Sequence, residues 1–179
     1  DRVKAIAPEG SPAIGASSAL AKVLWWRDQH FGGSWPQGRD TPCIFHQADW
    51  LAWLLHGQRS PDGRAWTDYH NALKLGGDPL TLTYPESWQG LDFWRSLPAI
   101  VPPGQAIGPI QPSIAETFGL PAHCLICAGT TDSNAAVWAS GIGQPGEAVT
   151  SLGSTLVVKL LTRQACLLYT SPSPRDRTR

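Results

Sequence analysis

The 179-residue sequence has no methionine, only four cysteines, and no apolar run long enough to cross a bilayer. Its 14 basic residues balance 14 acidic ones, so it lacks the positive field that is typical of nucleic-acid-binding proteins. The five histidines are scattered without the spacing of metal ligands. We therefore expect no nucleic-acid partner, no membrane partner and no metal site.

The missing methionine includes an initiator, because the chain opens on Asp1-Arg2-Val3. We interpret the chain as a fragment that lacks its true N-terminus, which removes any targeting segment from view. At the other end, residues 164–179 turn to Ser, Pro and Arg. As protein they would form a basic tail, but they look like translated adapter sequence, and we expect them to be non-native.

Cysteine is too sparse for a disulfide framework. Cys124 and Cys127 have the spacing of half a zinc or redox site, but no second pair accompanies them. They lie in an apolar run, where thiols behave as small hydrophobic groups. We expect buried thiols in a reducing compartment.

Apolar periodicity and turn residues predict helices that alternate with strands, which favours an α/β fold. Ser17 or Ser18 can cap the first helix, Gly57 ends the second, and Thr67 is expected to cap the third. The predicted helices are 17–29, 47–56, 68–75, one that opens at 84–86, and 112–119. The predicted strands are 106–110, 124–127, 147–151 and 156–161.

Two groups of apolar side chains are expected in the core. In the 47–56 helix, these are Leu51, Leu54 and Leu55. Most tryptophans recur at helical spacing, which is more typical of a core than of a sugar-stacking surface. This set includes Trp25, Trp26, Trp50, Trp53, Trp94 and Trp138, whereas Trp35 and Trp88 stand in loop-like segments that can reach a cleft.

The most informative stretch is Gly129-Thr130-Thr131-Asp132-Ser133, between an apolar run and a small-residue helix. A carboxylate there can take the proton from a hydroxyl that attacks a phosphate, a role worth about two to four orders of magnitude in rate. The alternative is helix capping by Thr131 or Asp132. The two roles are compatible.

A second small-residue turn, Gly153-Ser154-Thr155, follows about twenty residues later between two predicted strands. Its backbone N–H groups and two hydroxyls suit a phosphate. An ordinary hairpin turn is the alternative. Thr67-Asp68 likewise either contacts a sugar or caps a helix, and capping is the commoner use of such a pair.

The spaced motifs resemble those of the FGGY carbohydrate kinases over most of residues 17–162. The landmarks are 18–22, 47–51, 67–76, 108–110, 129–132 and 153–155. The variant Gly-Thr-Thr-Asp-Ser-Asn-Ala-Ala most resembles the D-ribulose kinase group of cyanobacteria and plants. The resemblance implies a partial actin-like (ribonuclease-H-like) fold. Residues 1–141 would be the latter part of the sugar-binding domain, and 142–163 the first hairpin of the ATP-binding domain.

The resemblance also implies site residues and chemistry. Asp132 would be the catalytic base, Thr131, Asp132 and Asp68 would contact the sugar, and Gly153, Ser154 and Thr155 would hold the phosphate of ATP. The implied enzyme transfers a phosphoryl group from ATP, with Mg²⁺, to a ketopentose such as D-ribulose, in the cytoplasm or a plastid. The family's N-terminal phosphate loop and adenine pocket are missing, so we expect the chain alone to be inactive.

Two alternatives stay open. One is a relative that phosphorylates xylulose or glycerol. The other is a non-catalytic, actin-like nucleotide-binding protein, which would be indifferent to replacement of Asp132.

Overall fold

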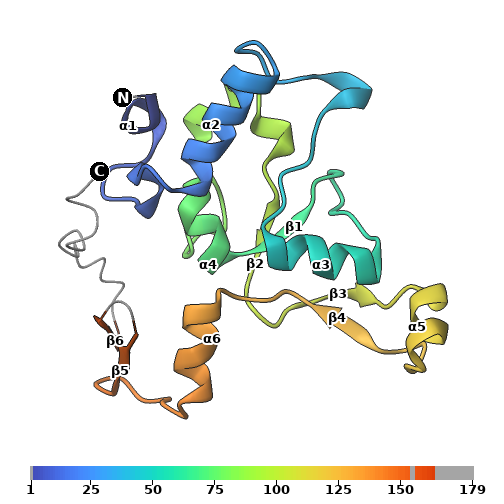
Figure 1. The fold of residues 1–179 in the computed structure, drawn as a ribbon, viewed down its shortest axis with the longest axis vertical. Helices are drawn as coiled ribbons and strands as arrows, with labels where there is room; N and C mark the ends of the chain where they lie inside the picture. Colours follow the sequence, from blue (N-terminus) through green and yellow to red (C-terminus); the bar gives the residue numbers. More distant parts are fainter. Residues whose placement is uncertain (1, 154–155, 164–179) are drawn as a thin grey trace. The chain divides into compact units, whose positions relative to one another are not determined.

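The computed structural model describes residues 2–153 and 156–163 (Figure 1). The chain divides into two compact units, Asp1–Thr131 and Asp132–Arg179. The predicted domain boundary at 141/142 stays a prediction, and the predicted non-native tail, 164–179, lies outside the described residues.

The first unit combines helices with two separate pairs of short strands. β1 pairs in parallel with β2, and β3 pairs antiparallel with β4 across a register shift between Ala106 and Gly108. Helix α3 contacts both pairs, so it lies between them (Figure 1). The helices and strands of the first unit are α1 (Arg2–Ile6), α2 (Ala19–His30), α3 (Gln47–His56), β1 (Trp66–Asp68), α4 (Tyr69–Ala72), β2 (Ala99–Val101), β3 (Ala106–Pro109), α5 (Pro112–Phe118) and β4 (Leu125–Cys127).

The second unit contains α6 (Asp132–Ala139) and an antiparallel hairpin of β5 (Ala148–Leu152) and β6 (Leu156–Leu160). The hairpin register pairs Leu152 with Leu156, and of the residues between them the structure describes Gly153. The two predicted strands are therefore confirmed.

The hydrophobic core of the first unit packs α2 against the short turns after α4. The α2 side chains Leu20, Val23 and Leu24 are buried, as the apolar stripe predicts. Ser18 caps this helix by accepting a hydrogen bond from the Ala21 backbone N–H at 3.0 Å. From the other side the core receives Leu75, Tyr84, Trp88, Phe93 and Leu97.

Two helix predictions need correction. The segment 68–75 is one α-helical turn, α4, followed by a 3₁₀ turn, and its cap is Asp68. Thr67 lies in β1 opposite Ile100, a pairing that sequence periodicity misses because the partner strand is 33 residues away. The segment from 84 forms two 3₁₀ turns, Glu86–Gly90 and Trp94–Ser96.

The core predictions for Leu51 and Leu54 of α3 are wrong. Both are exposed and Leu55 is half-buried, while the polar side chains of Asp49 and His56 are buried. The reason is that the face of α3 toward β1 carries the polar residues, a reversal that hydropathy cannot foresee.

The predictions for thiols and tryptophans also need correction. Cys127 is exposed and Cys124 half-buried, because β3 and β4 form only a two-stranded pair. Trp88 is buried in the core despite its loop setting, whereas Trp35, although buried, lines a cavity as its loop setting allows. The exposed tryptophans are Trp25, Trp26, Trp50 and Trp138.

Candidate functional site

Asp132 is the first residue of α6, and its side chain is exposed. One carboxylate oxygen accepts a hydrogen bond from the Ser133 backbone N–H at 2.6 Å. The carboxylate makes no ion pair within the described part of the chain. The helix start predicted at this position is confirmed, and the acid can be reached by a ligand.

Lys159 of β6 reaches the first turn of α6. Its ammonium donates hydrogen bonds to Asn134 Oδ1 at 2.6 Å and to Ser133 Oγ at 3.0 Å. Partial burial lowers the pKa of Lys159, and the charge of Asp132 acts in the opposite direction. A cation and a carboxylate thus stand at one helix end. Sequence reasoning missed this lysine, because a lone Lys in a strand looks like solvated surface.

A cavity of about 290 Å³ adjoins this cluster within the second unit. It is lined by Ser133, Ala136, Val137, Thr150, Ser151 and Lys159, among others. Gly153 is exposed in the hairpin turn, and Ser154 and Thr155 lie outside the described residues. Gly153 follows the strand that carries Thr150 and Ser151, and the phosphate turn stays a prediction.

Asp68 has a different setting in the first unit. Its side chain is fully buried and caps α4 by accepting from the backbone N–H groups of His70 (2.9 Å) and Asn71 (3.2 Å). Its second oxygen accepts from Asn71 Nδ2 at 2.6 Å. These bonds give Asp68 a capping role, and the predicted contact with a sugar stays a prediction.

The loop that precedes Asp132 is tied to α4. Thr130 Oγ1 and His70 Nδ1 share a hydrogen bond of 2.7 Å, and Thr131 is half-buried beside it. His70 also lies 3.9 Å from Asp68 Oδ1. Asp68 and the Thr130–Thr131 loop are thereby linked through one histidine. In the sequence, this role of His70 is indicated only by its position two residues after Asp68.

Two buried polar residues, Asp49 and Thr67, lie close to Gly129, which precedes this loop. Burial raises the pKa of Asp49 to about 7, a hydrogen bond with Thr67 opposes that shift, and the charge of Asp68 adds to it. Burial lowers the pKa of the neighbouring His46 to about 4. Gly129 and Thr67 both line a small void of about 10 Å³ beside Asp49, room for at most one water.

The described residues contain no group of three or more His, Cys, Asp or Glu side chains that could hold a metal ion. Mg²⁺ is held by carboxylates together with substrate phosphates, and Asp132 is the only acid at the α6 cluster within the described residues. The side chains described do not by themselves form a Mg²⁺ site.

In the described part of the chain, every helix is too short or too polar to cross a membrane. No known family model matches the sequence. Over 62 residues the chain is 37% identical to the ribulokinase of Halalkalibacterium halodurans, a match that covers 35% of this chain and 11% of that enzyme.

Solved structures match far more of the chain. The xylulose kinase from Rhodospirillum rubrum matches with a TM-score of 0.71 at 20% identity, over 87% of this chain and 31% of that one. A carbohydrate kinase from Novosphingobium aromaticivorans matches with a TM-score of 0.66 at 22% identity, over 93% and 36% of the two chains. The chain therefore spans about a third of these neighbours and a tenth of the ribulokinase. The predicted partial sugar-kinase fold and the resemblance to carbohydrate kinases are confirmed.

Proposed function

We propose that this chain carries the catalytic-base segment of an ATP-dependent sugar kinase that phosphorylates a ketopentose, D-ribulose being the first candidate. The observation that carries the proposal is the exposed carboxylate of Asp132 at the start of α6, with the Lys159 ammonium held on the same helical turn. Phosphoryl transfer to a hydroxyl needs a group that takes the proton and positive charge that faces the phosphate.

We propose one role for each residue of the site. Asp132 accepts the proton of the sugar hydroxyl as its oxygen attacks the γ-phosphorus and the bond to ADP breaks. Lys159 and the backbone of the 153–155 turn stabilise phosphate charge. Thr131 and Asp68 are proposed on the sugar side, where Asp68 acts at least through His70 and Thr130.

The substrate class rests on the relatives. One is named a ribulokinase and another a xylulose kinase, and both names denote ketopentoses. D-ribulose is proposed on the Gly129–Ala136 motif. Xylulose and glycerol are the alternatives within the kinase class.

ATP and Mg²⁺ are proposed as the cosubstrate and cofactor of the complete enzyme, with the cytoplasm or a plastid as its compartment. Because the described side chains make no Mg²⁺ site, other ligands must complete its coordination. Since the chain spans about a third of its structural neighbours, we propose that the remaining parts of the fold are needed for turnover. The 179-residue chain alone is expected to show no phosphorylation of any pentulose.

The test compares the complete protein that contains residues 2–163 with its Asp132→Asn variant, in an ADP-release assay on D-ribulose, D-xylulose and glycerol. We expect kcat to fall by about two to four orders of magnitude while the KM for ATP changes little. Asp40→Asn, which alters an exposed acid outside the cluster, is the matched control and should leave kcat unchanged.

Equal turnover by the wild type and Asp132→Asn would rule out the base role. Nucleotide binding without turnover on any of the three substrates would favour the non-catalytic, actin-like alternative.

A further inference from the structure

A second cavity, of about 500 Å³, lies in the first unit between α2 and the segment that leads into α3. This volume is within the range of small-molecule sites. Four of its lining side chains are aromatic: Trp26, Phe31, Trp35 and Phe45. We call it the aromatic pocket. None of the candidate kinase residues lines it.

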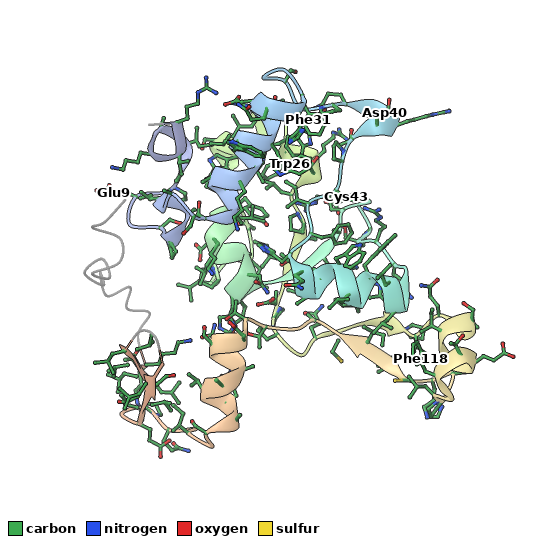
Figure 2. All side chains as sticks on the ribbon, viewed as in Figure 1. Glu9, Trp26, Phe31, Asp40, Cys43 and Phe118 are labelled. Atoms are coloured by element: carbon green, nitrogen blue, oxygen red, sulfur yellow. The ribbon has the colours of Figure 1, made fainter. Side chains whose placement is uncertain are left out.

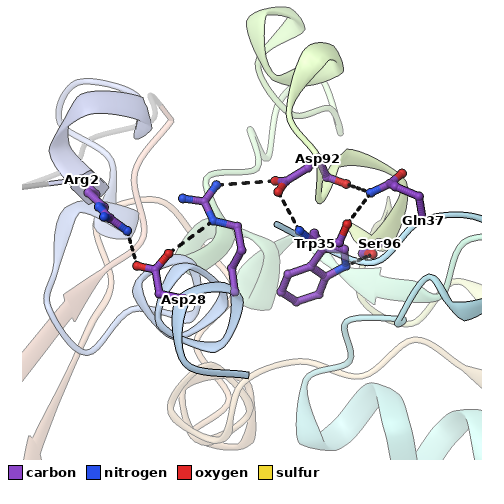
Figure 3. Close-up of polar contacts among 7 residues, drawn as sticks. Arg2, Asp28, Trp35, Gln37, Asp92 and Ser96 are labelled. Carbon is purple, nitrogen blue, oxygen red and sulfur yellow. Dashed lines mark hydrogen bonds and ion pairs between the residues drawn. The ribbon is translucent and has the colours of Figure 1, made fainter. Parts of the chain in front are cut away.

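The aromatic wall is held in place. Trp35 is buried, its indole Nε1 donates to Ser96 Oγ at 2.6 Å, and its backbone N–H donates to Asp92 Oδ2 at 2.8 Å (Figure 3). Phe31 meets Trp35 edge-on, with ring centroids 5.1 Å apart. Trp26 and Phe31 stand on α2 and at its end, and Cys43 on the segment alongside (Figure 2). A wall fixed in this way can receive a flat ring without rearrangement.

The basic residues that line the aromatic pocket are Lys22 and His46, Cys43 adds a thiol, and no carboxylate lines it. Lys22 makes no hydrogen bond or ion pair with the described residues. His46 Nε2 is buried and has no hydrogen-bond partner among the described residues. Because burial lowers the pKa of His46 to about 4, the ring is neutral at pH 7, so Lys22 supplies the positive charge of the pocket.

From this arrangement we infer that the aromatic pocket binds a planar aromatic carboxylate, with the ring against Trp26, Phe31 and Phe45 and the anion on Lys22. Such a ligand contacts α2 through Lys22 and Trp26, and the segment that leads into α3 through Phe45.

The test is calorimetric titration of the 179-residue chain with 2-naphthoate and with neutral 2-naphthamide, which has the same ring. We expect naphthoate to bind about tenfold more tightly than naphthamide, as a charge-assisted contact would give. Lys22→Gln should abolish that preference. Lys74→Gln removes a charge that also acts on His46 but does not line the pocket, so it should keep the preference.

A second pair of variants tests the ring contact. Trp26→Ala should lower the affinity for both ligands by about tenfold or more, because a stacking surface is lost. Its neighbour Trp25 is exposed and does not line the pocket, so Trp25→Ala should change neither affinity. Circular dichroism of each variant verifies that it is folded.

Equal affinity for naphthoate and naphthamide would overturn the inference, since it would indicate an unspecific apolar patch. So would a loss of binding in Trp25→Ala equal to that in Trp26→Ala, or no binding of naphthoate at about millimolar concentration. None of these outcomes depends on kinase activity, so this test stands apart from that of the proposed function.

Discussion

Asp49 is a carboxyl group that the fold removes from water at the start of α3. It is 7% exposed, and its Oδ2 accepts from the His46 backbone N–H at 3.3 Å. Burial raises its pKa from 3.8 to about 7, so folding favours the protonated acid. Its contribution to stability is fully present below pH 3.8 and is lost as the pH rises toward 7.

Asp49→Asn tests this directly, because the amide stays neutral at every pH. We expect the variant to gain stability relative to the wild type between pH 4 and pH 7, by about 3 kcal/mol. Urea denaturation at a series of pH values measures the difference. A difference that stays constant across this range would contradict the raised pKa.

His46 provides the opposite slope. Burial lowers its pKa from 6.5 to about 4, so its contribution is present above pH 6.5 and is lost as the pH falls toward 4. His46→Gln should therefore remove part of the acid-side loss of stability in the same denaturation series. If acid sensitivity is unchanged in this variant, His46 is not the group responsible.

At the scale of elements, Gly76 sets how α4 and its 3₁₀ turn end. Its φ is 92°, and an added Cβ would lie 2.5 Å from Trp88 Cη2. Trp88 cannot yield, because it is buried and its Nε1 donates to Ile6 O at 2.9 Å. The turn therefore needs glycine both for its conformation and for space.

Gly76→Ala should lower the free energy of unfolding by about 3 kcal/mol, through overpacking added to left-handed strain. Gly104→Ala is the matched control, because Gly104 has φ 79° but nothing lies within 4 Å of its added Cβ. That variant should lose only about 1 kcal/mol. Equal losses in thermal or urea denaturation would show that the contact with Trp88 is unimportant.

Local signals predicted some elements well and others not at all. The helical pattern of α3 and Gly57, the left-handed glycine that ends it, are both local features of the sequence. The predicted bounds of this helix, 47–56, are confirmed. β1 is three residues long and depends on pairing with β2, which begins 33 positions after it. No local pattern specifies such a pairing, and the sequence therefore predicts Thr67 as a helix cap although it lies in this strand.

At the scale of the molecule, the two units differ in how much they bury. The first unit has a hydrophobic core, whereas none of the described residues of α6, β5 and β6 is buried. Leu152 is 83% exposed and Leu156 63%. A two-stranded hairpin with so little burial is only marginally stable by itself.

Hydrogen exchange of the 179-residue chain should show this contrast. We expect the amide protons of β5 and β6 to exchange at least about tenfold faster than those of α2 and β2, because local opening is easier where little apolar surface is buried. Mass spectrometry of peptides from each element measures the rates. Equal protection in both units would mean that the hairpin is stabilised by contacts beyond those described.

The sequence by itself determined the order of the elements near the site, the place of Asp132 at a helix start and the likeness to sugar kinases. Each of these is written in short motifs and local caps. Only the tertiary structure decided which face of α3 is buried and which tryptophans lie in the core. It also brought His70 to Thr130 and Lys159 to Asn134. Those contacts join residues 25 or more positions apart, and packing rather than local pattern selects them.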